Sequence, residues 1–193
     1  MRKIFLKKLA FAALFASLLS FGQSKTVNAS EINWWGYKLA KTAASSHTGT
    51  VDLKSGNVVM KGNQVTGGTF VMDMTTITST DLEGDRQKKL NEHLKHGDFF
   101  ETNKFPEAVY KITSVQKNKD QVYRFKINGT LTVKNQTHPV SFPANITVEK
   151  GTVTIVSDKF SFDRQKFGVS YQSSMKDVLI KNEVDMKVKV TAK

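Results

Sequence analysis

The stretch HLKHGDFFETNKFPEAVYKITSV, residues 93–115, changes its hydrophobic period half-way along and so marks a junction between a helix and a strand. It continues a polar segment in which Leu90 and Leu94, four residues apart, share one helix face. Pro106 cannot extend a helix and favours an extended chain before it. From Ala108 onward apolar and polar residues alternate, which is typical of a strand with one buried face. The stretch predicts a short helix, an aromatic corner and then a strand.

The remainder of the chain, above all its C-terminal half, has the period of two that predicts β-strands. In the segments 123–133, 140–148 and 184–190 the apolar residues fall on one face and the polar residues on the other. Between Ile155 and Phe160 the phase reverses, and a bulge of one residue would return both side chains to the same face. Turns rich in Gly, Asn and Pro separate these segments, which favours an antiparallel meander.

Strands with one apolar face fit either a sandwich or a closed barrel, and the barrel has the advantage of removing exposed sheet edges. We therefore expect an all-β fold, an extended antiparallel β-barrel of about eight strands with one short helix covering it. At this strand number the interior is wide enough either to be filled by side chains or to hold a ligand. The alternation alone leaves both interpretations open.

The N-terminus has the features of an export signal. Four basic residues within the first eight positions precede an apolar run at 9–21, which is too short for a comfortable membrane span. Small residues allow cleavage after Gly22 or as late as Ala29. We predict a signal peptide over 1–22, a single mature domain over 31–193, and a periplasmic or secreted location.

Composition excludes several classes of function. The chain of 193 residues has no cysteine, so it forms no disulfide and carries no lipid on an N-terminal Cys; we expect a soluble mature form. Its net charge is +12. The predicted leader contains four basic residues and no acidic residue, so the chain without the leader has 25 basic and 17 acidic residues and a net charge of +8. The lysines are spread along the chain without the clustered Arg and stacking aromatics of a nucleic-acid site. We predict no nucleic-acid partner.

Motifs for catalysis or metal binding are weak. His93 and His96, next to Glu92, have a spacing that superficially suggests a metal ligand pair, but a zinc signature needs more ligands at wider spacings. We interpret them as solvated helix residues and predict no metal. The sequence contains no recognisable nucleophile–base pair, so we predict no catalytic residues and no enzymatic activity.

Three side chains are candidates for contact with a polar head group. Arg164 and Lys166 lie two apart, on one side of a chain that we expect to be extended, next to aromatic residues. They would either bind a polar or phosphorylated head group at a pocket mouth or form the outward charges of a barrel rim. His47 would either orient a ligand or be a hydrogen-bonded structural histidine, and the second interpretation is the simpler one.

A series of motifs runs through nearly the whole mature chain. They are SHTG at 46–49, GGTF at 67–70, DMTTI at 73–77, HLK at 93–95, DFF at 98–100, KFPEA at 104–108, GTLTV at 129–133, THPV at 137–140 and DRQKFG at 163–168. In this order the motifs resemble the YceI-like family of exported lipid-binding proteins.

The resemblance implies a lipocalin-like barrel whose apolar tunnel accommodates a polyisoprenoid lipid, with no established enzymatic activity. The implied ligand is a quinone or a polyprenyl phosphate, held for transport or storage, and we expect no cofactor besides a bound isoprenoid lipid. A lipid carrier also implies transient membrane contact, and a homodimer is left open. The candidate lining residues are Trp35, Phe70, Met72, Leu90, Leu94, Phe99, Phe100, Phe105, Tyr110, Phe125, Ile127 and Phe142.

Two other functions remain open at this point. The first is a stress or interaction protein whose barrel is packed solid and binds no ligand. The second is a lipid-modifying enzyme with His47, Arg164 or Lys166 at the tunnel mouth.

Overall fold

The computed structural model describes residues 22–40, 44–119, 122–173, 175 and 177–193. Most of the described chain is antiparallel sheet. The elements, in chain order, are β1 (Gln23–Ala40), β2 (Ala44–Lys61), β3 (Gln64–Ser79), α1 (Gly84–Lys95), β4 (Glu107–Lys117), β5 (Phe125–Val133), β6 (Gln136–Glu149), β7 (Thr152–Ser157), β8 (Phe160–Asp163), a 3₁₀ helix (Arg164–Phe167), β9 (Val178–Ile180) and β10 (Glu183–Ala192).

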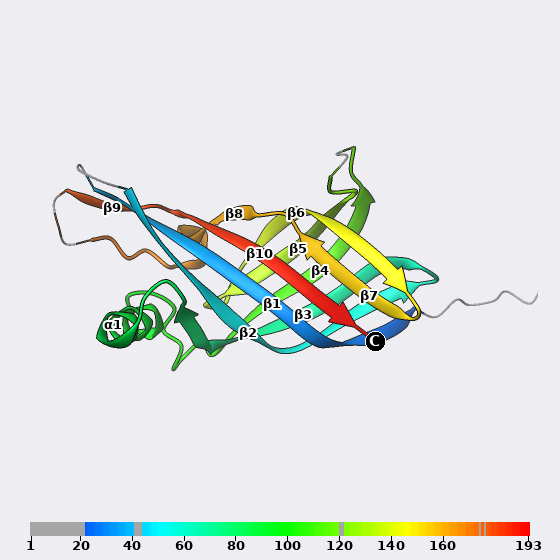
Figure 1. Ribbon diagram of the computed structural model, residues 1–193, viewed down its shortest axis with the longest axis horizontal. Helices are drawn as coiled ribbons and strands as arrows, with labels where there is room; N and C mark the ends of the chain where they lie inside the picture. Colours follow the sequence, from blue (N-terminus) through cyan, green and yellow to red (C-terminus); the bar gives the residue numbers. More distant parts are fainter. Residues whose placement is uncertain (1–21, 41–43, 120–121, 174, 176) are drawn as a thin grey trace, which may run out of the picture.

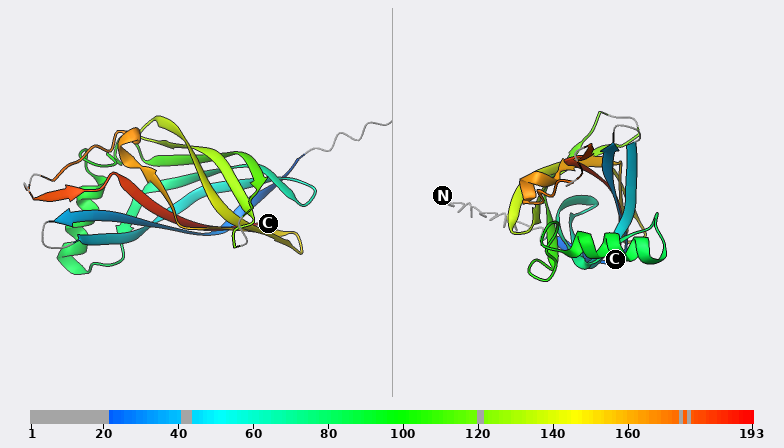
Figure 2. Two further views of the ribbon diagram at one scale, coloured as in Figure 1. Left: turned by 90° about the horizontal axis from the view of Figure 1, so that it is seen from above. Right: turned by 90° about the vertical axis from the view of Figure 1, so that its left-hand side faces the viewer.

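The sheet closes into a barrel. Strands β1 to β7 pair with their neighbours in chain order, and β10 pairs with both β7 and β1 (Figure 1). The short β8 continues the course of β7 along β10, and the short β9 pairs with the end of β1. Seen along its axis, the barrel is a ring of strands with α1 at the near end (Figure 2). The prediction of an antiparallel barrel with eight strands and one helix is confirmed.

A bulge between β7 and β8 keeps the apolar residues of both strands on the inside. Val156 lies opposite Lys189 and Phe160 opposite Met186, so this side of the ladder holds one residue more than β10. The predicted one-residue bulge is confirmed. Inside it, the buried Ser157 hydroxyl accepts a hydrogen bond from the Val188 N–H at 2.8 Å. A side chain thus replaces the backbone acceptor that the bulge displaces.

Helix α1 lies at one end of the barrel, against the end of β3. Leu94 is buried and Leu90 partly buried on the same face, as predicted. Polar side chains complete the attachment: the Asn91 amide oxygen accepts from the Ser79 N–H at 2.8 Å, and Gln87 donates to the Ser79 carbonyl at 2.8 Å. These two amides satisfy the backbone N–H and carbonyl of Ser79, the last residue of β3. The attachment of the helix to the barrel therefore needs only a narrow apolar stripe.

The domain starts earlier than residue 31. Strand β1 begins at Gln23, which pairs with Met60, and Val27 pairs with Ala192 at the barrel end opposite α1. The polar segment before residue 31 is a strand because its backbone is paired, with β2 over Gln23–Thr26 and with β10 from Val27 onward, although Val27 alone among its side chains packs on the core. Cleavage after Ala29 would remove the first seven of the 18 residues of this strand, whereas cleavage after Gly22 would spare it. The rest of the predicted signal peptide, 1–21, lies outside the described residues.

No helix in the described part of the chain is both long and apolar enough to cross a bilayer.

Candidate functional site

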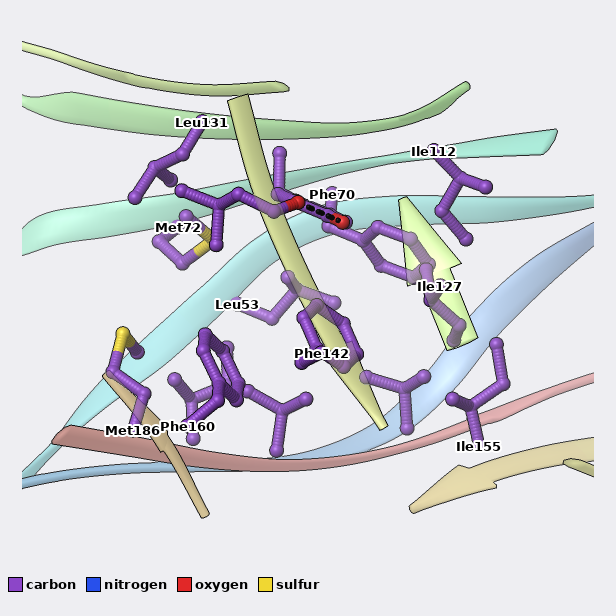
Figure 3. Close-up of a pocket in the computed structure, with 15 residues that line it drawn as sticks. Leu53, Phe70, Met72, Ile112, Ile127, Leu131, Phe142, Ile155, Phe160 and Met186 are labelled. Carbon is purple, nitrogen blue, oxygen red and sulfur yellow. Dashed lines mark hydrogen bonds between the residues drawn. The ribbon is translucent and has the colours of Figure 1, made fainter. Parts of the chain in front are cut away.

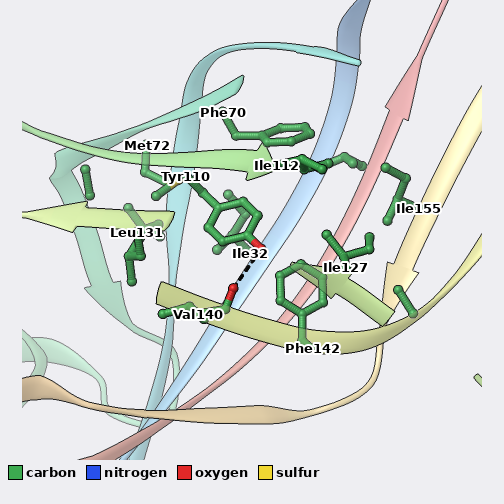
Figure 4. Close-up of a cluster of buried hydrophobic side chains, with 14 of the residues drawn as sticks. Ile32, Phe70, Met72, Tyr110, Ile112, Ile127, Leu131, Val140, Phe142 and Ile155 are labelled. Carbon is green, nitrogen blue, oxygen red and sulfur yellow. Dashed lines mark hydrogen bonds between the residues drawn. The ribbon is translucent and has the colours of Figure 1, made fainter. Parts of the chain in front are cut away.

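The barrel encloses a central chamber with an apolar wall. Its volume is about 70 Å³, and Phe70 and Met72 of β3, Ile127 of β5 and Phe142 of β6 point into it (Figure 3). Tyr110 completes the wall, and its hydroxyl donates to the Val140 carbonyl at 3.0 Å (Figure 4). The chamber therefore offers hydrocarbon contact and no free polar group from this tyrosine.

Two further chambers continue the central one toward α1. A junction chamber of about 100 Å³ shares Met72, Leu131 and Met186 with the central chamber. A mouth chamber of about 250 Å³ shares Phe99 and Arg164 with the junction chamber. The three adjoin in series, from the middle of the barrel to its α1 end.

The structure distributes most of the predicted lining residues among these chambers. The central chamber takes Phe70, Met72, Tyr110, Ile127 and Phe142; the junction chamber takes Met72, Leu94, Phe99 and Phe100; the mouth chamber takes Leu90, Leu94 and Phe99. Phe105, half-buried beneath the Lys104 ammonium, and Phe125, at the start of β5, are not among the side chains that line them.

The lining tryptophan is Trp34, and the assignment of Trp35 to the interior is corrected. Trp34 is buried, and its ring lies on Gly49, where a Cβ atom would approach the ring to 2.3 Å. The Trp34 indole donates to the Thr50 carbonyl at 3.2 Å. Trp35, on the other face of β1, has the Lys159 ammonium 4.2 Å from its ring. The glycine of the SHTG motif, opposite Trp34 in the ladder, is the signal that identifies the inward ring.

Arg164 stands where the junction and mouth chambers meet. It is only 2% exposed, so the interpretation as an outward rim charge is wrong for this residue. Its Nε donates to the Lys181 carbonyl at 3.0 Å and its Nη1 to the Val169 carbonyl at 2.6 Å. Its Nη2 donates to Tyr171 at 2.8 Å and to Ile180 at 3.4 Å. Burial lowers the pKa of Arg164, but a guanidinium remains charged at neutral pH.

Lys166 lies apart from Arg164. The chain at this point is a 3₁₀ helix and not the extended segment that we predicted, so residues two apart point in different directions. Lys166 is exposed and lines a separate outer groove with His138 and Phe167. Of the three predicted head-group residues, the structure brings His47 and Arg164 to the mouth chamber and leaves Lys166 outside it.

His47 is fixed by a carboxylate. Its Nδ1 lies 2.8 Å from Asp81 Oδ2, and the Thr48 N–H donates to Asp81 Oδ1 at 2.9 Å. Burial acts against ionisation of Asp81, but the hydrogen bonds from His47 and Thr48 outweigh it and hold the pKa of Asp81 below its ordinary value. His47 is thus hydrogen-bonded, as the simpler interpretation held, and it also lines the mouth chamber.

Three of the rings that line the mouth chamber contact one another. His93 of α1 lies edge-on to Phe99 and Tyr171, with centroid distances of 5.0 and 4.5 Å, and Phe99 lies 5.3 Å from Tyr171. His96, in contrast, has its Nδ1 3.6 Å from Asp98. The two histidines of the helix therefore have separate surroundings.

A sequence model described as the YceI-like domain matches residues 25–192. The chain belongs to the YceI-like family. Proteins named YceI from Shigella flexneri and Escherichia coli O157:H7 are each 29% identical to it over 126 residues. The match covers 61% of this YceI-like chain and 61% of each of these curated relatives.

Solved structures share the barrel of this YceI-like protein. BcnA from Burkholderia cenocepacia superposes with a TM-score of 0.65 at 17% identity, over 85% of this chain and 96% of that one. A polyisoprenoid binding domain from Saccharophagus degradans, implicated in plant cell wall breakdown, superposes with a TM-score of 0.57 at 10% identity, over 88% of this chain and 97% of that one. At these identities the likeness is one of fold.

Proposed function

We propose that this YceI-like protein binds an isoprenoid-type lipid, with the tail in the central and junction chambers and the head group in the mouth chamber. The observation that carries the proposal is the series of adjoining chambers, apolar in the middle of the barrel and polar only at its α1 end. The polyisoprenoid binding domain from Saccharophagus degradans, with the same barrel, supports it.

The energetics of such a site favour a long apolar chain. Each methylene group removed from water contributes about 0.8 kcal/mol, so several isoprene units supply a large driving force. The cost of association and of ordering a flexible tail offsets part of this gain, so affinity rises less steeply than buried area. A narrow bore then selects for thin, extended hydrocarbon chains.

Binding fits the site better than catalysis. Among the described residues, no Ser or Thr hydroxyl is hydrogen-bonded to His47 or His93, so neither imidazole is placed to activate a nucleophile. A solidly packed interaction protein would lack the chambers. With export to the periplasm or medium, as the N-terminal sequence predicts, the function would be transport or storage of the lipid outside the cytoplasm.

Native mass spectrometry of the protein purified from its own host tests this proposal. We expect a co-purified species whose mass, after lipid extraction, matches an isoprenoid lipid. Protein that is consistently empty, and that also fails to bind added geranylgeraniol, would contradict lipid binding.

A further inference from the structure

The barrel wall contains an interval in which two neighbouring strands do not pair with each other. Strand β6 pairs with β7 from Ala144 onward, but β8, which follows β7, pairs with β10 alone among the described strands. The last link between the two sides is a hydrogen bond of 2.9 Å from the Asp158 N–H to the Pro143 carbonyl. Beyond it, residues 138–141 of β6 and 161–163 of β8 line opposite sides of the outer groove, whose volume is about 240 Å³. We call this interval the seam.

Two prolines on β6 explain why the ladder stops at the seam. The Pro143 carbonyl is directed to the edge of β6 that faces away from β5, where it accepts the Asp158 N–H. Backbone groups of residues an even number apart in a strand point to the same edge, so Pro139 faces this edge as well. A proline has no N–H to donate, so neither residue can contribute a donor to a ladder with β8. The sequence of β6 therefore disfavours pairing across the seam.

Aromatic side chains close the seam instead. Phe142 of β6 stacks on Phe160 of β8, with ring centroids 4.4 Å apart and an interplanar angle of 17° (Figure 3). His138 of β6 lies edge-on to Phe167 at 5.2 Å, and Phe167 lies edge-on to Phe162 of β8 at 5.5 Å. Separating a paired ladder would deprive backbone N–H and carbonyl groups of their partners, whereas these ring contacts can part without that cost.

The seam runs beside the apolar chambers. Val140 lines both the central chamber and the outer groove. Phe162 lines both the junction chamber and the outer groove. At each of these positions a single side chain therefore separates the outside of the barrel from the space proposed for a lipid tail.

The way through the mouth chamber is more restricted. Arg164 and Phe99 stand between the mouth and junction chambers, and the Arg164 guanidinium is fixed by hydrogen bonds to four backbone carbonyls. A tail that entered there would have to thread end-first past these two side chains and along the whole bore. Through the seam the same tail could enter along its length.

We infer that the seam between β6 and β8 is a lateral portal through which the apolar tail of the ligand enters and leaves the bore. The inference rests on the proposed function, because it concerns the route to the proposed lipid site. The rings that close the seam move aside by rotation about side-chain torsions, and the two strands separate without breaking a ladder. Because a portal changes only the barrier, closing it slows association and dissociation by the same factor and leaves Kd unchanged.

A cross-link over the seam tests the portal. The chain has no cysteine, so Ser141→Cys with Ser161→Cys introduces two unique thiols, one at each exposed side of the outer groove. A short bis-maleimide then ties the two strands together, and the intact mass of the protein verifies the link. The variant Trp35→Phe serves as the background, because it isolates the fluorescence of Trp34, which lines the junction and mouth chambers.

Stopped-flow fluorescence with farnesol measures both rate constants before and after linking. We expect association and dissociation to slow at least about tenfold in the linked protein, the effect of about 1.4 kcal/mol on a barrier, at unchanged Kd. The matched control is Thr147→Cys with Thr154→Cys, which lie opposite each other on the paired part of β6 and β7. The same linker at this position should leave both rates unchanged.

A second variant tests the portal without a cross-link. Phe167 contacts both His138 and Phe162 but lines none of the three inner chambers. Phe167→Leu keeps an apolar side chain and removes both ring contacts across the seam. We expect farnesol to enter and leave at least about threefold faster in this variant, again with unchanged Kd.

The outcomes separate the portal from the proposed function. Unchanged rates in the linked protein, with binding intact, would overturn the portal and leave lipid binding in place. Weaker affinity without slower dissociation would mean that the link acts on the chambers and not on a route, and would also overturn the portal. Failure of the unlinked protein to bind farnesol would overturn the proposed function itself.

Discussion

The hydroxyl of Tyr110 on β4 reaches over β5 and donates to the Val140 carbonyl on β6, 3.0 Å away. The strand between them is crossed at Gly129, where a Cβ atom would lie 2.5 Å from the tyrosine ring. A single side chain thus links three consecutive strands across the wall of the central chamber. The glycine of the GTLTV motif makes room for the ring.

Tyr110→Phe should lower the free energy of unfolding by about 1–3 kcal/mol, because it leaves the Val140 carbonyl without its buried donor. Urea unfolding of the two proteins measures the difference. Tyr37→Phe is a useful comparison, since the Tyr37 hydroxyl donates a hydrogen bond to Asp185, which is partly exposed. Water can take the place of the lost hydroxyl as a donor to Asp185. An equal loss in both variants would contradict the special role of the buried bond.

The free energy of unfolding should fall at alkaline pH because of the buried Tyr110 hydroxyl. Burial raises the pKa of Tyr110 well above the value near 10 that a tyrosine has in the unfolded chain. Above about pH 10 the unfolded chain therefore releases a proton that the folded protein retains, and unfolding becomes more favourable as pH rises. Urea midpoints between pH 8 and 11 should decline less in Tyr110→Phe than in the unaltered protein. Identical slopes would show that Tyr110 does not contribute.

A bulky side chain at Met186 should shorten the space for a lipid tail. Met186 lines both the central and the junction chamber, so Met186→Trp narrows the passage between them. We expect affinity for geranylgeraniol to fall at least about tenfold, equivalent to roughly two buried methylenes, and affinity for the shorter geraniol to change less. Lys187→Trp, on the exposed face of the same strand, is the matched control and should bind both alcohols as before. Unimpaired binding of the longer alcohol to Met186→Trp would contradict a tail in the central chamber.

Ser157→Ala should destabilise the barrel by about 1–3 kcal/mol, because the Val188 N–H loses its acceptor within the bulge. Ser157→Thr keeps the hydroxyl and tests whether the hydrogen bond or the volume matters. Hydrogen exchange at Val188 provides a local readout, and exchange should accelerate in the Ala variant. Unchanged exchange would mean that this N–H finds another acceptor.

Much of the fold was predictable because a strand with one buried face has alternating apolar and polar residues in its sequence. Alternation identified the strands, and the reversed phase between Ile155 and Phe160 located the bulge, since only an extra residue reconciles the two sets with one interior. The segment before residue 31 was missed because it is polar. Its pairing with β2 and β10 depends on backbone hydrogen bonds, which composition does not record.

The site was less predictable than the fold. Trp34 and Trp35 are consecutive residues of the same type, so residue type does not distinguish them. The register of the strand decides which of the two rings faces inward. Arg164 and Lys166 were separated by a short 3₁₀ turn, which the local sequence did not signal. Arg164 is held by carbonyls from segments well after it in the chain, so its burial follows from tertiary structure and not from a local pattern.

The barrel is sealed by its first and last strands, with Ile32 of β1 opposite Val188 of β10. This seam joins segments almost the whole chain apart, so its loop-closure entropy is among the largest in the fold and the seam should form late. Without the pairing of β10 with β1, the sheet would be open, with two free edges and no enclosed bore. Cargo can be retained only after β10 has paired with β1, which makes loading a step that follows barrel closure.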